Sequence, residues 1–262
     1  MKRIMTFILM IITVTLCMCS CSFSVGTGGT SGGDNNSTSS TSQKNKEVNI
    51  IIKNGDESIS KTVKVGEKAS ITISGKREKY LDGIYDTEEG EEGTKYFDCL
   101  GNALVEWEES FPTTLYARWK DISSLKQVID AVGNEPRQST QYLYCIQETL
   151  KLDDNFISAL KGNFDKKLKI QYKAELKRNP IKDVNVSLKC TFKGYKSDGA
   201  DKHTIFEYIP KTTSFENVYG TVLINAADFV DGDIYLKIEP ESKSDTRTFY
   251  IRNLSFTISL AE

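Results

Sequence analysis

The strongest constraint on the fold is a strict alternation of apolar and charged residues in the second half of the chain. Residues 166–177 read KKLKIQYKAELK, so that every second side chain from Leu168 to Leu176 is apolar and the side chains between them are polar or charged. This period of two predicts a strand with one buried face and one solvated face. The pattern recurs in residues 184–192, 233–238 and 254–260, with turn-forming residues between them. Several such strands without long intervening helices favour an antiparallel β-sandwich over about residues 140–262.

Composition narrows the classes of function. The chain of 262 residues is 39% hydrophobic and 27% charged, which is typical of a globular protein with a packed core. Its 34 Lys and Arg against 36 Asp and Glu give a formal net charge of −2. This balance argues against nucleic acid as a partner, because neutralising phosphates requires clustered basic residues.

The N-terminus reads as a targeting segment. Lys2 and Arg3 precede an apolar run over residues 4–16, which is too short to span a bilayer and fits a secretory signal peptide. Three cysteines follow at once, and this ending resembles the bacterial lipobox, in which a cysteine is lipidated and becomes the new N-terminus. Cys21 fits best, with Cys19 second; the alternative is an ordinary cleaved signal peptide. The resemblance implies a signal peptide over residues 1–21 and an extracytoplasmic protein, anchored to the bacterial membrane by lipid and exposed on the cell surface.

Residues 22–46 are rich in Gly, Ser, Thr and Asn and predict a flexible tether. Residues 47–121 then combine short strand patterns, an acidic Gly-rich loop and the ending TTLYARW at residues 113–119. Together with Val65–Gly66, Gly83, Tyr85 and Lys95–Tyr96, this order resembles the Listeria–Bacteroides repeat, an internalin-type B repeat. The resemblance implies a small β-grasp-like module of a surface protein.

Between these parts, apolar residues at 122, 125, 128, 129 and 132 fall at helical spacing and end at Gly133. They predict a linker over residues 122–139 that contains a short helix. The expected fold class is therefore mainly β: a β-grasp-like module followed by an antiparallel β-sandwich. The closing residues 249–260 loosely resemble the last strand of jelly-roll, galactose-binding-like domains.

Three cysteines lie beyond the N-terminal segment. Cys99, Cys145 and Cys190 cannot all pair within one chain. Cys145 and Cys190 occupy apolar surroundings, so we expect either buried free thiols or a Cys145–Cys190 disulfide.

No catalytic or metal-binding pattern stands out. His203 is the single histidine of the chain and no CxxC motif occurs. Asp228, Asp231 and Asp233 could offer oxygens to calcium, but they lack the spacing of an EF-hand loop, and a plain turn explains them better. We therefore expect no cofactor, no metal and no enzymatic activity.

A ligand site is most plausible around the polar loop of residues 194–208. Aromatic rings cover the apolar faces of sugars, and the sandwich contains no tryptophan, so tyrosines near its loops are the candidates. We expect contacts from Tyr195, Tyr208 and Tyr219, with His203 beside them. The alternative is that Tyr208 and Tyr219 are partly buried strand residues.

The expected function is that of a non-catalytic binding or adhesion protein for a glycan or a cell-surface protein. Two alternatives remain open: a carbohydrate-active enzyme that uses paired carboxylates, and a purely structural envelope protein.

Overall fold

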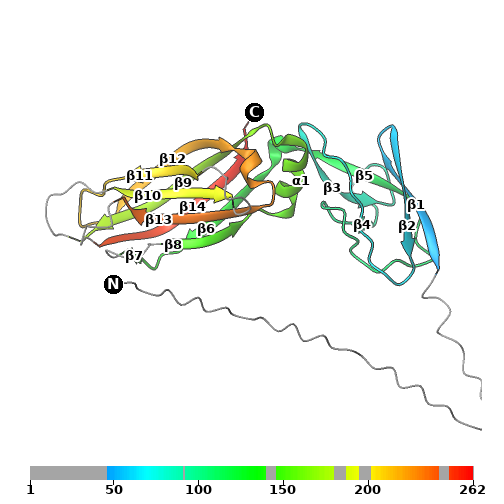
Figure 1. Ribbon diagram of the computed structural model, residues 1–262, viewed down its shortest axis with the longest axis horizontal. Coiled ribbons are helices and arrows are strands. Elements are labelled where there is room, and N and C mark those ends of the chain that lie inside the picture. The colour runs from blue at the N-terminus through cyan, green and yellow to red at the C-terminus, as the bar shows by residue number, and fades with distance from the viewer. Residues whose placement is uncertain are drawn as a thin grey trace, which may run out of the picture. The chain divides into compact units, whose positions relative to one another are not determined.

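A computed structural model describes residues 46–90, 92–139, 146–179, 187–194, 202–241 and 248–261 (Figure 1). The expected lipidation site Cys21, the expected tether before residue 46, Cys145 and Tyr195 lie outside these residues. The described residues belong to one compact unit and form two hydrophobic cores. Residues 46–121 are called the first module, and residues 122–261 the sandwich.

The first module is a mixed five-stranded sheet. Its strands are β1 (Glu47–Asn54), β2 (Glu57–Lys64), β3 (Lys79–Tyr85), β4 (Lys95–Phe97) and β5 (Thr114–Asp121). Their order is β2-β1-β5-β3-β4, with β1 and β5 parallel at the centre and the other pairs antiparallel. Gly55 takes a positive φ of 69° in the two-residue turn between β1 and β2, a conformation that favours glycine. One face of the sheet buries the module's core around Phe97, Trp107 and Leu115.

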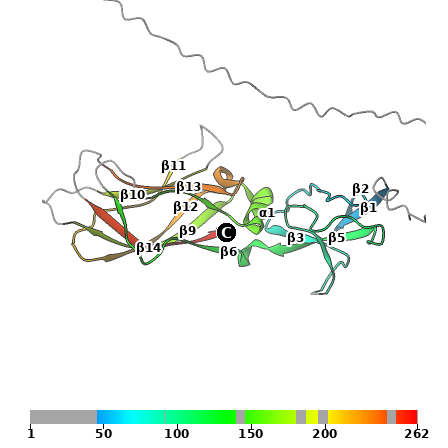
Figure 2. The ribbon, with the colours of Figure 1, turned by 90° about the horizontal axis from the view of Figure 1, so that it is seen from below.

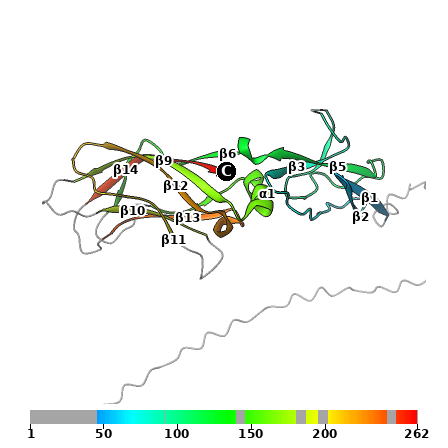
Figure 3. The same cartoon turned by 90° about the horizontal axis from the view of Figure 1, so that it is seen from above.

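The sandwich contains two sheets in separate layers (Figures 2 and 3). One has the order β11-β10-β13-β8, from β8 (Ile146–Lys151), β10 (Leu188–Gly194), β11 (Lys202–Tyr208) and β13 (Asp233–Pro240). The other has the order β12-β9-β14-β6, from β6 (Lys126–Val132), β9 (Lys167–Arg178), β12 (Glu216–Asn225) and β14 (Phe249–Leu260), and β7 (Arg137–Ser139) also pairs with β14. The remaining elements are η1 (Ile122–Ser124), α1 (Asp154–Asn163) and η2 (Ala226–Phe229).

The alternation that predicts β9 is the alternation that builds the core. Leu168, Ile170, Ala174 and Leu176 are fully buried, while the lysines between them face solvent or lie at its margin. Aromatic pairs join the two layers: Phe192 of β10 meets Phe256 of β14 with ring centroids 4.8 Å apart. Offset and edge-to-face ring pairs of this kind add to the free energy gained by burial.

The prediction of a short helix within residues 122–139 is wrong. Ile122–Ser124 form one turn of 3-10 helix, and Lys126–Val132 form strand β6, which pairs with β14. The misleading residue is Val128, which completes the helical spacing but is 64% exposed on the outside of the sheet. β-branched residues and the available edge of β14 favour the strand over a local helix. The boundaries of the predicted domains remain predictions.

The helix α1 was not expected from the strand patterns around it. Asp153 caps it by accepting a hydrogen bond of 2.9 Å from the backbone nitrogen of Phe156. Its last residue, Asn163, is fully buried against the first module, where its Oδ1 accepts from the nitrogen of Glu78 and its Nδ2 lies within 3.3 Å of the carbonyl oxygens of Lys76 and Lys79. Within the described residues no helix is long and apolar enough to cross a membrane.

The predicted fold class, mainly β with a small module followed by an antiparallel β-sandwich, is confirmed, and the sheet of the module is mixed. Cys99 and Cys190 are buried free thiols, which supports their reading as small apolar core residues. Burial raises the pKa of the Cys99 thiol to about 11 and that of Cys190 well above its ordinary value.

Candidate ligand-binding face

The structure places the three described candidate residues at separate positions. His203, at the start of β11, lies 2.7 Å from the carboxylate of Asp228 and beside the ring of Phe229. Tyr208, at the other end of β11, donates a hydrogen bond of 2.7 Å to Glu216. Five residues of strand separate them by about 16 Å. Both are held by other side chains of the protein, so the chain does not bring the expected site together.

Tyr219 differs from the other two. It lies on β12 and is 77% exposed, although Val218 beside it is buried in the core. A tyrosine buries a large area when it folds inward, so a ring left in solvent on a regular strand indicates a contact surface. Tyr219 is therefore the starting point for a candidate site.

Tyr219 belongs to the outer face of the β12-β9-β14-β6 sheet. The register aligns Tyr219 with Lys173, Lys173 with Ser255, and Ser255 with Asp130, so one row of side chains crosses all four strands. The rows beside it follow the same registers. We call this surface the polar sheet face, defined by Tyr219, Thr221, Leu223, Lys169, Gln171, Lys173, Glu175, Ser255, Thr257, Ser259, Lys126, Val128 and Asp130.

An irregularity in β14 shapes one end of this face. The pairing of β14 with β9 shifts between Arg252 and Ser255, and Asn253 adopts a left-handed φ of 49°, which asparagine tolerates better than most residues. Its Nδ2 donates to Glu175 Oε1 at 2.9 Å, and Arg252 Nε donates to Glu175 Oε2 at 2.8 Å. The hydrogen bonds from Asn253 and from Arg252 lower the pKa of the Glu175 carboxyl below its ordinary value.

The bulge opens a recess of about 390 Å³ on the polar sheet face. Its lining offers two carboxylates, an ammonium, an amide and a hydroxyl, together with Val132 and Gly133; the polar residues are Asp130, Glu175, Lys173, Asn253 and Ser255. Lys173 belongs both to this lining and to the row that begins at Tyr219. Since neighbouring strands lie about 4.8 Å apart, the Tyr219 backbone is about 10 Å from that of Ser255. The face can therefore seat an extended polar ligand with one ring on Tyr219 and the next groups in the recess.

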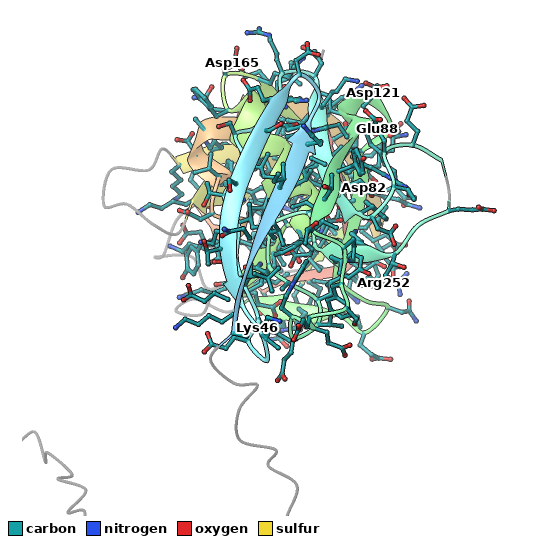
Figure 4. The ribbon with its side chains drawn as sticks, turned by 90° about the vertical axis from the view of Figure 1, so that its right-hand side faces the viewer. Lys46, Asp82, Glu88, Asp121, Asp165 and Arg252 are labelled. Atoms are coloured by element: carbon teal, nitrogen blue, oxygen red, sulfur yellow. The ribbon has the colours of Figure 1, made fainter. Side chains whose placement is uncertain are left out.

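The first module has a larger hollow, of about 680 Å³, lined by charged residues of β3, β5 and the loop between β3 and β4. Three of those charged groups, Asp82, Arg118 and Lys120, are already engaged within the module. Asp82 lies 2.9 Å from Lys120 and accepts from the hydroxyl of Tyr85, and Figure 4, with β1 and β2 in front, shows Asp82 on the β3–β5 side of the sheet. Arg118 stacks over Tyr85 at 4.1 Å.

The Arg118 guanidinium also organises the acidic loop. It donates to the carbonyl oxygens of Thr87, Gly90 and Glu92 at 3.0, 2.6 and 2.8 Å. The arginine of the TTLYARW ending is therefore a structural group that folds the loop back onto β5. Much of this hollow is therefore organised by contacts within the module, whereas the polar sheet face presents the exposed ring of Tyr219.

The described residues contain no cluster of His, Cys, Asp and Glu suited to a metal ion. Asp228 contacts His203, and Asp233 forms an ion pair with Lys151 at 3.2 Å, so these two carboxylates of the possible calcium turn are engaged.

The residues of the recess were not identifiable from sequence. Asp130, Lys173 and Ser255 come together through strand register, which appears only when the sheet is assembled. Asn253 carried one local signal, since asparagine inside a strand pattern often marks a bulge or turn.

Comparison with known proteins identifies no family: no family model and no curated protein matches the chain. Among solved structures, one of infectious bursal disease virus (Gx strain) aligns at 9% identity and a TM-score of 0.36, over 82% of this chain and 58% of that one. The VP2 subviral particle of the same virus aligns at 11% identity and a TM-score of 0.33, over 59% of this chain and 37% of that one. A CBM4 structure aligns at 12% identity and a TM-score of 0.23, over 54% of this chain and 87% of that one. The chain thus spans well under two thirds of these viral chains, and at these scores none of the likenesses supports a shared function.

Proposed function

We propose that this chain is a non-catalytic glycan-binding protein and that the polar sheet face is its binding surface. The observation that carries the proposal is the row from Tyr219 across Lys173 and Ser255 to Asp130, with a 77% exposed aromatic ring at one end and a polar recess at the other. Sugars present apolar ring faces and a rim of hydroxyls, and this row offers a partner for each.

The same surface argues against hydrolysis. A glycosidase needs one carboxyl that stays protonated to serve as acid and a second that serves as base or nucleophile. Glu175 is the carboxylate most firmly held in the recess, and its bonds to Asn253 and Arg252 favour the ionised form. It therefore suits ligand positioning better than proton donation, and the enzyme remains the second candidate.

We further propose that the protein is a lipoprotein attached through Cys21, with residues 22–46 as a tether, and that the first module is a Listeria–Bacteroides repeat. The support is the basic, apolar and cysteine-rich order of residues 1–21 and the sequence TTLYARW at residues 113–119, most of which forms β5. These features suit an adhesion protein that presents its sandwich beyond the membrane surface. Globomycin-sensitive processing and a diacylated Cys21 in mass spectra would support the anchor, while an unlipidated mature chain would contradict it.

The binding proposal is tested with the purified full-length chain on a glycan array, followed by calorimetry with the oligosaccharide that binds best. Tyr219→Ala should lower the affinity at least tenfold, because stacking on an aromatic ring supplies most of the apolar contact. The matched control is Tyr235→Ala, which removes a half-exposed tyrosine from β13 in the other sheet. Equal affinity of both variants and the parent would contradict the proposed face, and an array without any bound glycan would contradict the proposed function.

A further inference from the structure

We infer that the polar sheet face selects acidic polysaccharides, chains that carry carboxylate or sulfate groups, over neutral ones. This inference rests on the proposed glycan-binding function and adds the chemical class of the ligand.

The first argument is the local balance of charge. The polar sheet face itself carries Lys169 and Lys173 of β9 and Lys126 of β6, and Lys167 and Lys177 continue the outer side of β9 beyond it. The acidic side chains on this surface are Asp130 and Glu175. The chain as a whole has a formal charge of −2, so the basic residues are concentrated on this face against the overall trend. Such a patch attracts anions over roughly one Debye length at physiological salt.

The second argument is that part of this charge is uncompensated. Arg252 neutralises Glu175 at 2.7 Å, and Lys177 lies over the rings of Phe215 and Tyr250. Among the described residues Lys169 and Lys173 form no ion pair within 4 Å, and both are exposed, although Lys173 lies close enough to Glu175 to help lower the pKa of that carboxyl. Their ammonium groups are therefore available to an anionic ligand.

The outer face of the opposite sheet provides a contrast within the same sandwich. Three lysines there lie beside carboxylates: Lys189 with Glu207 at 4.0 Å, Lys202 with Glu239 at 3.6 Å, and Lys151 with Asp233 at 3.2 Å. These three ammonium groups are paired, as expected for a charged surface that only needs to be soluble.

Protection of a sheet edge does not account for the lysines of β9. Edge strands often carry lysine to prevent pairing with another sheet. β9 instead lies inside its sheet, between β12 and β14, and has both neighbours hydrogen-bonded over most of its length.

The spacing of these groups suits a polymer. Lys169 and Lys173 are four residues apart on one strand, which places their backbones about 13 Å from each other. Gln171 lies between them, with Thr221 and Thr257 as its neighbours across the strands. A polysaccharide lying along β9 can thus place one anionic group on each of the two lysines. Its sugar hydroxyls can then meet the amide of Gln171 and the hydroxyls of Thr221 and Thr257, and one sugar ring can stack on Tyr219, which pairs with Lys173.

The experiment compares polygalacturonate with the same polymer after full methyl esterification, which removes the charge and keeps the backbone. Binding to the full-length chain is measured by affinity electrophoresis or calorimetry at low and at physiological salt. We expect polygalacturonate to bind at least tenfold more tightly than the ester, and its affinity to fall as salt rises.

Two double variants distinguish an effect of lysines on the polar sheet face from an effect of the protein's net charge. Lys169→Gln/Lys173→Gln should weaken polygalacturonate binding about tenfold, while Lys61→Gln/Lys64→Gln on β2 of the first module makes the same change in net charge and should have little effect. Equal losses in both doubles would overturn the inference.

The remaining outcomes are also decisive. Tight binding of the neutral ester, insensitive to salt, would overturn the acidic preference and leave the glycan-binding function standing. A third outcome is that the protein binds vesicles containing an anionic phospholipid, binds neither polymer, and is unaffected by Tyr219→Ala. This outcome would overturn both the acidic preference and the glycan-binding function, and would indicate a membrane-contacting surface.

Discussion

Replacing Asn163 with alanine should destabilise the protein far more than its size suggests. Asn163 is fully buried at the end of α1, and its Oδ1 accepts a hydrogen bond of 2.7 Å from the backbone nitrogen of Glu78. Its Nδ2 lies 2.9 Å from the carbonyl of Ala159 and within 3.3 Å of those of Lys76 and Lys79. One side chain therefore satisfies backbone groups of both α1 and the strand β3 region.

The magnitude follows from what the substitution leaves behind. Asn163→Ala removes the acceptor of one amide and the donor for up to two carbonyls, and each buried group left unsatisfied costs about 1–3 kcal/mol. Glu78 also has a left-handed φ of 60°, an uncommon conformation for a glutamate, which the bond to Asn163 helps to hold. Since some of these groups regain water, we expect a loss of about 2–4 kcal/mol in the free energy of unfolding.

The assay is equilibrium unfolding in urea followed by two probes. Trp107 and Trp119 are the two tryptophans of the chain and lie in the first module, so their fluorescence reports that module, while far-ultraviolet circular dichroism reports all strands. A loss of this size should shift the midpoint by about 1–2 M urea. The matched control is Asn217→Ala, an exposed residue of β12, whose effect should stay within about 0.5 kcal/mol. A midpoint for Asn163→Ala equal to that of the control would refute the reasoning.

Three further outcomes are expected. Cys99 and Cys190 should both resist alkylation at neutral pH in the native state and react once the chain is unfolded, because burial raises the pKa of each thiol; rapid native labelling of either would contradict its buried position. Arg118→Lys should speed cleavage of the 86–92 loop by a glutamate-specific protease about tenfold, since an ammonium cannot replace the guanidinium bonds to three carbonyls. Burial raises the pKa of Asp82, but its hydrogen bonds from Lys120 and Tyr85 outweigh this and leave the pKa below its ordinary 3.8. The stability that Asp82 contributes is therefore complete above pH 3.8 and is lost as the pH falls through the lowered pKa, and Asp82→Asn should flatten the acid limb of the stability profile.

The strands that could be predicted from sequence are those whose alternation is set by one buried face. β9, β13 and β14 have buried apolar residues at every second position over most of their length, so the pattern and the structure agree. β6 was read as a helix because exposed Val128 completes a helical spacing, and only its pairing with β14 decides the outcome. α1 is ten residues long, so its buried Phe156, Ala159 and Leu160 formed a helical pattern too short to stand out among strands.

The candidate site, like the fold, could be predicted only in part from the sequence. Tyr219 was expected as a contact residue near a loop, and it lies instead on the outside of a strand at 77% exposure. Its ligand role stays a prediction. Lys173, Ser255 and Asp130 became its neighbours through the registers of three strand pairs, which depend on bulges in β14 and β6 that no local pattern specifies. Short-range chemistry thus predicts which residues face outward, and long-range pairing decides which of them meet.

The claim that glycans bind the polar sheet face is tested most directly by an NMR titration of the full-length chain with oligogalacturonides. The account predicts fast, saturable amide shifts confined to residues 126–133, 169–175, 217–223 and 253–259, with the largest beside Tyr219 and Asn253. Shifts centred on Arg118 and Trp119 in the first module, or an unchanged spectrum at saturating oligosaccharide together with an array that shows no bound glycan, would contradict it.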